Sequence, residues 1–207
     1  MASKASGKAK RNREDPPDVK LSKFISYICR HGAEKEGITL LSGGYVAVSA
    51  ILSHRRGKQH TEEDVRRVVT NCPKSRFALT EMSGQLLIRA NQGHTLQVDD
   101  LELTPILRAE DAPTVVHGTN KKAWGSIQAE GLSRMKRNHI HFATGLPGES
   151  GVISGMRSSS HVLIFVDMQK ALDGGFQFYR SSNDVILCPG NEHGILPPIY
   201  FSEVRTN

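Results

Sequence analysis

Three helical patterns followed by a hairpin pattern fill the first half of the chain, and this order constrains the fold more than any other feature. Apolar residues recur at i, i+3, i+4 and i+7 from Leu21, which is the spacing of one helical face, and Gly32 is a suitable end for that helix. Residues 43–46 indicate a turn into a short strand, and a short second helix is expected to end near Ser53. Thr61, with an acidic residue three positions later, predicts the N-cap of a third helix through a weakened capping box.

Two strand patterns come after the third helix, at residues 77–80 and 85–88. They are joined through Met82-Ser83-Gly84, which is typical of a hairpin turn. Three helices and a terminal hairpin are the order of a winged-helix unit, which we place at residues 18–97. Such units often hold nucleic acid, but a fold alone does not establish a function.

The rest of the chain is expected to form three further parts. Residues 1–17 are polar and basic, show no periodicity and end in two prolines, so they predict a solvated, disordered tail. Residues 98–113 carry five acids and two prolines among scattered apolar residues, which indicates a connector packed on the surface. Residues 114–207 contain short strands with few helices between them, which favours a mixed α+β lobe over a doubly wound sheet. The whole chain is therefore predicted to be α+β.

The second lobe is expected to contain one clear helix and several strands. The helix pattern covers residues 121–130, and Gly131 is its predicted C-terminal cap. The strand patterns cover residues 115–116, 139–142, 162–166 and 185–187.

Composition limits the partners and the compartment. A net charge of +6 and an isoelectric point near 9.3 suit a polyanionic partner, although several of the positive charges lie in the tail. No stretch approaches the roughly 20 apolar residues of a membrane helix, and the first residues lack the apolar run of a secretory signal. We therefore expect an intracellular protein of the cytoplasm, the nucleus or both. The three cysteines, Cys29, Cys72 and Cys188, are odd in number and include no C-x-x-C pair, so they predict buried or inert thiols rather than disulfides or a zinc site.

Two basic segments in the first lobe are open to more than one interpretation. Arg30-His31-Gly32 can be a helix C-terminus at which cations complement the helix dipole. The same residues can form an anion site, because arginine offers a fork to phosphate and histidine changes charge near neutral pH. Arg76, just before the first hairpin strand, is by default a solvated residue at a sheet edge.

A third basic segment, residues 135–142, belongs to the second lobe. Strand alternation puts Arg137, His139 and His141 on one face and Asn138 on the other. This face can be an exposed basic strand. A metal site formed with His117 is disfavoured, because no acid or cysteine at a fitting spacing completes it.

Small residues mark two further candidates for close contact with a ligand. His117-Gly118-Thr119 stands at a strand end, where glycine lets a ligand approach the backbone and its neighbours supply side-chain donors. Residues 151–160 place small residues and hydroxyls around Arg157, which suits either a phosphate or ribose loop or a flexible surface loop. Residues 178–187 are by default a turn into a strand.

Taken together and in this order, these segments resemble the RNA 2′-phosphotransferase family. The resemblance spans roughly residues 19–201. It is carried by residues 21–32, 74–77, 88–94, 117–119, 137–141, 152–160 and 178–187. The resemblance implies an N-terminal winged-helix lobe that binds RNA and a C-terminal ADP-ribosyltransferase-like lobe that binds NAD+.

The resemblance also implies roles for individual residues. The catalytic set of the family corresponds to Arg30, His31, Arg76 and Arg137. The NAD+ pocket corresponds to His117, Gly118, Thr119, Asn138, His141, Ser154, Gly155 and Arg157. The chain departs from the family pattern at two positions, with Cys29 where leucine is usual and Asp184 where glycine is common.

The activity implied by the resemblance is the last step of tRNA splicing. The splice-junction 2′-phosphate of tRNA attacks NAD+ and releases nicotinamide, which gives a 2′-phospho-ADP-ribosylated RNA. The ADP-ribose hydroxyl then attacks the phosphodiester and leaves 2′-hydroxyl RNA and ADP-ribose 1″,2″-cyclic phosphate. This reaction uses NAD+ as a co-substrate and needs no metal. We expect the protein to be a monomer.

The catalytic set is expected to serve mainly the second of these steps. Three arginines can stabilise charge that builds on phosphorus, and His31 can transfer a proton for the entering or leaving hydroxyl. One alternative is a mono-ADP-ribosyltransferase that stops after the first step and modifies nucleic-acid phosphate ends or protein. The other is a non-enzymatic winged-helix protein that binds nucleic acid.

Overall fold

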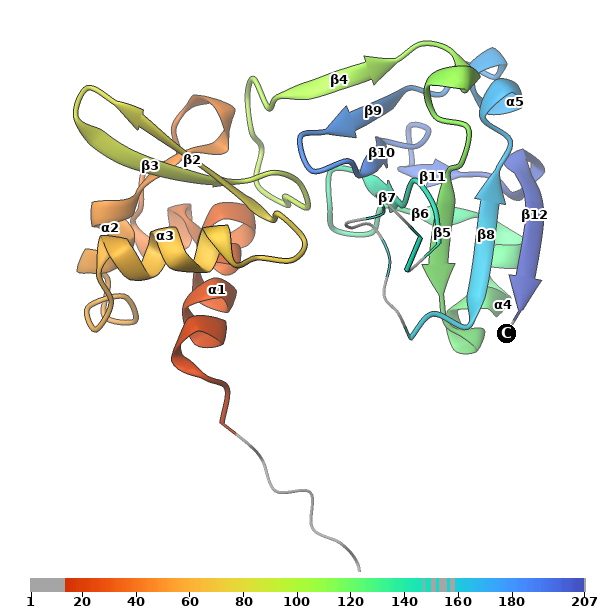
Figure 1. Ribbon diagram of the computed structural model, residues 1–207. Helices are drawn as coiled ribbons and strands as arrows, with labels where there is room; N and C mark the ends of the chain where they lie inside the picture. Colours follow the sequence, from red (N-terminus) through yellow and green to blue (C-terminus); the bar gives the residue numbers. More distant parts are fainter. Residues whose placement is uncertain (1–13, 147, 150–151, 153–155, 157–158, 207) are drawn as a thin grey trace, which may run out of the picture.

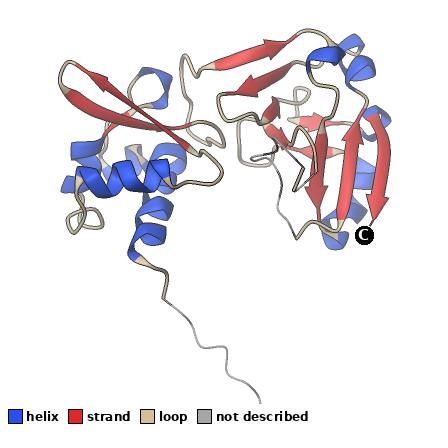
Figure 2. Cartoon of the chain, in the orientation of Figure 1, coloured by secondary structure: helices blue, strands red, loops and turns tan. Residues whose placement is uncertain are grey.

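The computed structural model describes residues 14–146, 148–149, 152, 156 and 159–206. The elements form a mixed α+β structure with several antiparallel sheets, in two groups that lie side by side (Figure 1). Residues 14–96 form the first half and residues 103–206 the second. In Figure 2 the helices of the first half lie in the left group, and most of the strands lie in the right group, which is the second half.

The first half contains three α-helices and a small sheet with the strand order β1-β3-β2. Its elements are α1 (Pro17–Tyr27), β1 (Val46–Ala47), α2 (Val48–Ser53), α3 (Glu62–Thr70), β2 (Phe77–Met82) and β3 (Gln85–Ala90). Each predicted helix and both predicted hairpin strands are present. Their inward faces form one core that includes Leu21, Phe24, Ile51, Val65 and Ile88.

The first helical run ends at Gly32, as predicted, but its last turn is not α-helical. After α1 the chain continues into a π-helical turn, Ile28–Gly32, in which the Ala33 N–H donates to the Ile28 carbonyl over 3.1 Å. A bond that spans five residues widens the helix, and such turns are common at functional sites. This turn carries Arg30 and His31.

The capping box of α3 and the hairpin turn are both confirmed. Thr61 Oγ1 accepts the Asp64 N–H at 3.2 Å, and an Asp64 carboxylate oxygen accepts the Thr61 N–H at 2.9 Å. Ser83 and Gly84 lie between the paired residues Met82 and Gln85 with φ of 49° and 75°. Two positive φ angles in a two-residue loop are typical of a type I′ turn, whose twist matches that of the strands.

The second half is built from three antiparallel sheets, with strand orders β4-β9-β10-β7, β12-β8-β5 and β11-β6. The predicted helix is found over the expected residues as α4 (Lys121–Glu130). The strands are β4 (Leu103–Ile106), β5 (Val116–Thr119), β6 (Leu132–Ser133), β7 (Ile140–Phe142), β8 (Val162–Val166), β9 (Phe178–Ser181), β10 (Ile186–Cys188), β11 (Ile195–Leu196) and β12 (Phe201–Thr206), and a short helix is α5 (Met168–Asp173).

The segment expected to be a connector contains strand β4. Residues 103–106 pair with β9 in antiparallel register, at the edge of the four-stranded sheet. Pro105 is tolerated there because an edge strand leaves one row of N–H groups unpaired. The second half therefore gains a strand from the segment that follows the first half.

Asp184, one of the two departures from the family pattern, has a structural explanation. It lies in the turn between β9 and β10 with φ of 59°, a conformation that glycine adopts freely and that aspartate tolerates better than most residues. Its carboxylate pairs with Arg180 and accepts the Thr144 hydroxyl at 3.1 Å. Cys29, the other departure, is fully buried in the first core, and burial raises the pKa of its thiol to about 12.

Candidate active site

A cavity of about 480 Å³ is lined by residues from both halves of the chain. The first half contributes Arg30 from the π-helical turn and Arg76 from the residue before β2. The second half contributes Arg137 from the loop before β7. The structure therefore brings the three predicted catalytic arginines to one cavity.

Arg30 is the most constrained of these arginines. Its Nε and Nη2 atoms are buried, and neither has a hydrogen-bond partner among the residues that the structure describes. Burial lowers the pKa of Arg30 to about 10, and the neighbouring charges of Arg137 and Arg76 act in the same direction. The two buried, unpartnered donors of Arg30, beside two further cationic side chains, are arranged to receive an anion.

His31 follows Arg30 but lines a neighbouring groove rather than the cavity itself. Its Nδ1 lies 3.0 Å from Thr95 Oγ1, and the Thr95 hydroxyl donates to the Arg30 carbonyl at 3.3 Å. Because that hydroxyl has one proton, we assign the Nδ1–H of His31 as the donor to Thr95. Burial lowers the pKa of His31, and Arg30 and Arg137 lower it further. The ring is thus neutral at pH 7, with Nε2 available to accept a proton.

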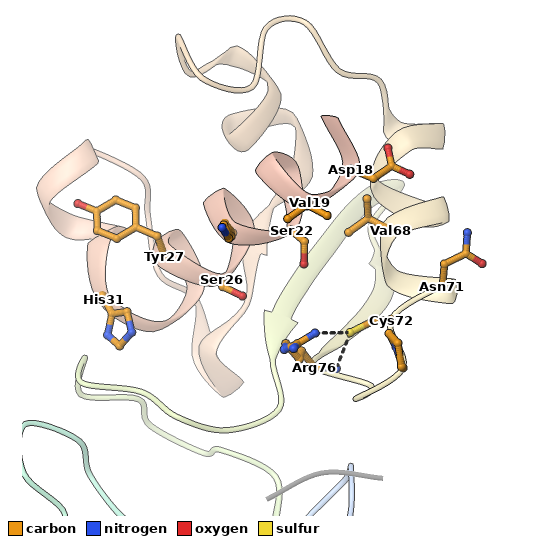
Figure 3. A pocket seen from close by; sticks show the side chains of 12 residues that line it. Asp18, Val19, Ser22, Ser26, Tyr27, His31, Val68, Asn71, Cys72 and Arg76 are labelled. Atoms are coloured by element: carbon orange, nitrogen blue, oxygen red, sulfur yellow. Dashed lines mark hydrogen bonds between the residues drawn. The ribbon is translucent and has the colours of Figure 1, made fainter. Parts of the chain in front are cut away.

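Arg76 is held by a residue that the sequence analysis took for inert. Cys72 Sγ accepts the Arg76 backbone N–H at 3.5 Å and its Nη1–H at 3.2 Å (Figure 3). Partial burial acts to raise the pKa of the Cys72 thiol, but hydrogen bonds from Arg76 and the Lys74 backbone outweigh it and lower the pKa. Of the three thiols predicted to be buried or inert, Cys29 and Cys188 are buried, whereas Cys72 is half-buried.

The second half supplies the other wall of the cavity through His117, Gly118, Thr119 and His141. The His117 Nδ1–H donates to the His141 carbonyl at 2.9 Å, which fixes the orientation of that ring. A Cβ atom on Gly118 would lie 2.2 Å from Met156 Sδ and 2.6 Å from Ser160 Oγ. A side chain at position 118 would therefore displace the ends of the Met156 and Ser160 side chains, which pack directly against the β5 backbone.

Other predicted members of the nucleotide pocket are placed differently. The Asn138 side chain does not line the cavity, because its Nδ2 donates to the Leu96 carbonyl at 2.8 Å. The Asn138 backbone N–H donates to the His94 carbonyl at 3.0 Å, so Asn138 fastens the second half to the first. His139, which was expected on one strand face with Arg137 and His141 but not assigned to this pocket, does not line the cavity and packs against the Tyr179 ring. Ser154, Gly155 and Arg157 lie outside the described residues.

The cavity includes polar residues to which the sequence analysis gave no role. Lys74 lines it and donates through Nζ to the Met156 carbonyl at 3.3 Å. Gln92, Asn120 and Ser160 line it as well. Lys74 and Gln92 lie within the segments that carry the family resemblance, and this position was the only signal that could have found them.

The stability of the protein is expected to fall in mild acid, because two buried histidines stay neutral in the folded state. Burial lowers the pKa of His94 to about 4 and that of His141 to about 3, with further contributions from Arg30 and Arg137, respectively. In the unfolded chain both rings have a pKa of about 6.5, so below that pH only the unfolded state binds these protons. Each ring should therefore remove about 2 kcal/mol from the free energy of unfolding between pH 7 and pH 5, measured by urea unfolding.

A matched variant isolates this effect. With both His94→Gln and His141→Gln, the loss of stability between the two pH values should shrink by about 4 kcal/mol. An undiminished loss would show that other groups cause the acid sensitivity.

Two absences hold for the described part of the chain. It contains no group of three or more histidine, cysteine, aspartate or glutamate residues that could hold a metal ion. None of its helices is long and apolar enough to cross a membrane.

Comparison with known proteins identifies the family. The family model described as RNA 2′-phosphotransferase, Tpt1 / KptA family matches residues 16–190. The tRNA 2′-phosphotransferase 1 of Danio rerio is 47% identical over 96% of this chain and 90% of its own length. Its human counterpart is 49% identical over 95% of this chain and 79% of its own, and the tRNA 2′-phosphotransferase of Saccharomyces cerevisiae is 41% identical over 84% and 80%. The chain therefore belongs to the RNA 2′-phosphotransferase family.

Proposed function

We propose that this chain removes the splice-junction 2′-phosphate of tRNA by transferring it to NAD+. The convergence of Arg30, Arg76 and Arg137 on one cavity is the observation that carries the proposal. Three guanidinium groups around one cavity suit a single phosphorus atom, since each offers a planar fork to phosphate oxygens. The relatives named above, which are tRNA 2′-phosphotransferases, support the same substrate class.

The proposal extends to the architecture and to the co-substrate. The helices and hairpin of the first half support a winged-helix lobe at residues 18–97, and the antiparallel sheets of the second half support an ADP-ribosyltransferase-like lobe at residues 114–207. The backbone at Gly118, which lines the cavity without a side chain, and the unpartnered Nε2 of His141 fit a ligand bound through close polar contacts. We place NAD+ there, against His117 and Thr119, and the family resemblance adds Ser154, Gly155 and Arg157 to the residues that bind it.

We call Arg30, Arg76 and Arg137 the arginine cluster. The first step needs this cluster only to position the phosphate. The 2′-phosphate is already ionised at neutral pH, and its oxygen forms a bond to the anomeric carbon of the nicotinamide ribose as nicotinamide leaves. Arg30, Arg76 and Arg137 hold the phosphate in place for this attack, so binding geometry dominates the rate.

The second step requires charge stabilisation and proton transfer. The ADP-ribose 2″-hydroxyl attacks phosphorus, the cyclic phosphate forms, and the 2′-oxygen of the RNA leaves. Negative charge builds on the phosphoryl oxygens, where one well-placed donor is typically worth about 3 kcal/mol. Neutral His31 takes the proton of the attacking hydroxyl through Nε2 and supplies one to the departing 2′-oxygen.

Incubation with a 2′-phosphorylated oligoribonucleotide, with and without NAD+, tests this function. The proposal predicts 2′-hydroxyl RNA, nicotinamide and ADP-ribose cyclic phosphate, and only when NAD+ is present. If ADP-ribose stays on the RNA as the final product, the chain is an ADP-ribosyltransferase instead. If NAD+ does not bind, as measured by calorimetry, neither enzymatic function stands.

Cys72 is expected to act as a positioning residue for Arg76. Replacing Cys72 with alanine removes the acceptor of the Arg76 Nη1–H, so kcat/KM should fall by roughly five- to tenfold, the effect of about 1 kcal/mol. The Cys72→Ser variant keeps an acceptor at this position and should recover most of the loss. Equal activity of the alanine variant and the parent chain would show that Arg76 does not need this contact.

A further inference from the structure

A second cavity, a groove of about 550 Å³, lies in the first half (Figure 3), and Arg76 is among the residues that line it. It runs between α1, the end of α3 and the turn that leads to β2. Arg76 lines both this groove and the cavity of the arginine cluster, and His31 lines the groove as well. The groove therefore begins at the catalytic residues and leads away from them over the first half.

Small polar side chains line the wall of this groove. Ser22 and Ser26 are one turn apart on α1, so their hydroxyls lie on the same face of the helix. Both side chains point toward the turn that carries Cys72 and Arg76 (Figure 3). Asn71, the C-cap residue of α3, adds an amide from the opposite wall. Hydroxyls and amides of this kind make many of the contacts to nucleic-acid phosphate and sugar.

The charges of the groove favour an anionic strand at its inner end. Arg76 supplies the positive charge there. At the outer end, the carboxylate of Asp18 accepts two hydrogen bonds from Arg67, at 2.7 and 3.0 Å, and Arg67 also pairs with Asp64. The exposed Lys23 lies beside the groove and is paired with Asp15. The negative charge at the outer end of the groove is thus partly compensated by Arg67, while the catalytic end of the groove carries the positive charge of Arg76.

The apolar part of the lining suits sugar and base edges. Val19, Val68 and Pro73 form this part. The Tyr27 ring borders it, and its hydroxyl donates to a Glu36 carboxylate oxygen at 3.1 Å, which holds the ring in place. The groove thus has both polar and apolar lining residues and a positive charge at its inner end. This combination suits single-stranded nucleic acid, which has a charged backbone and flat apolar bases.

We propose that this groove binds the RNA strand beside the 2′-phosphorylated nucleotide, through Ser22, Ser26 and Asn71. The inference rests on the proposed function, because a phosphate held by Arg30, Arg76 and Arg137 belongs to a nucleotide within a longer strand. The cavity of the arginine cluster must also accept the reacting part of NAD+, so the strand has to continue outside it. The groove that shares Arg76 offers that path, and its contacts recognise backbone rather than sequence.

Kinetics on two substrates test this inference. The full chain is assayed with NAD+ on a 2′-phosphorylated dinucleotide and on a longer single-stranded RNA with the same phosphorylated nucleotide inside it. Ser22→Asp and Asn71→Asp each place a negative charge in the groove. Ser202→Asp adds the same charge on the exposed surface of β12, in the other half, and is the matched control.

The measured quantity is kcat/KM for the longer RNA divided by kcat/KM for the dinucleotide. In each groove variant this ratio should fall by about tenfold or more, through a higher KM for the longer RNA, and the control should keep the parent ratio. The Asn71 side chain is exposed, so this variant tests the groove even if Ser22→Asp impairs folding. Unchanged ratios in folded groove variants, with both substrates still turned over, would overturn the inference and point to another occupant, such as a protein segment. No turnover of either substrate by the parent chain would overturn the proposed function itself.

Discussion

Replacing His31 with alanine is expected to stall the reaction between its two steps. The first step needs no proton transfer, whereas the second loses its acid–base group and should slow by roughly 10²- to 10⁴-fold. The His31 ring suits a proton-transfer role, because burial and Arg30 lower its pKa and its Nδ1 bonds to Thr95, which leaves Nε2 to accept a proton. RNA with ADP-ribose on its 2′-phosphate should therefore accumulate in a single-turnover assay with end-labelled substrate.

The control for this experiment is His193→Ala. His193 is exposed in the turn before β11, far along the chain from the cavity residues, and its loss should leave both steps at the parent rates. Complete and fast conversion to 2′-hydroxyl RNA by the His31→Ala variant would contradict the assignment. Loss of the first step as well would show that His31 contributes to binding rather than to proton transfer alone.

Replacing Arg30 with lysine is expected to lower kcat/KM by roughly 10²- to 10³-fold, although the positive charge is kept. A lysine ammonium cannot reproduce the planar fork, and the buried Nε and Nη2 positions of Arg30 are the donors left for the phosphate. The loss should appear in kcat at saturating NAD+, since the charge that these donors stabilise develops mainly in the second step. Steady-state assays on 2′-phosphorylated RNA measure it.

Arg108→Lys is the matched control for this substitution. Arg108 is exposed and pairs with Asp111 on the surface, so the same change of side chain should alter kcat/KM less than twofold, in keeping with the small effects of most surface substitutions. If Arg30→Lys behaves like this control, the arginine cluster does not recognise phosphate through its fork geometry.

Elements with a strong local signal could be predicted from the sequence. The helix at residues 121–130, the Thr61 capping box and the Ser83-Gly84 turn are found as expected, because each depends on contacts between residues close in the chain. The strand at residues 162–166 is also found where its apolar run lies.

Elements that depend on distant partners could not be predicted in the same way. Strand β4 contains a proline and is ordered by pairing with β9, some seventy positions later. Strand β12 has mostly exposed side chains and forms by pairing with β8. The π-helical turn at Ile28–Gly32 is closed by the bond from the Ala33 N–H to the Ile28 carbonyl, and the apolar spacing gives no signal for this wider turn.

The candidate site shows the same division. Family resemblance pointed to Arg30, Arg76 and Arg137, and the structure brings them to one cavity. It did not point to Cys72, which contacts Arg76 through a sulfur whose role depends on the local turn. Nor could residue order show that the Asn138 amide reaches the Leu96 carbonyl, since that bond joins the two halves.

A crystal structure of the chain with a 2′-phosphorylated dinucleotide tests the central claim most directly. The account predicts one phosphorus atom whose oxygens accept hydrogen bonds of about 2.7–2.9 Å from guanidinium nitrogens of Arg30, Arg76 and Arg137 together. A 2′-phosphate bound away from these arginines, or held by residues of one half alone, would contradict it.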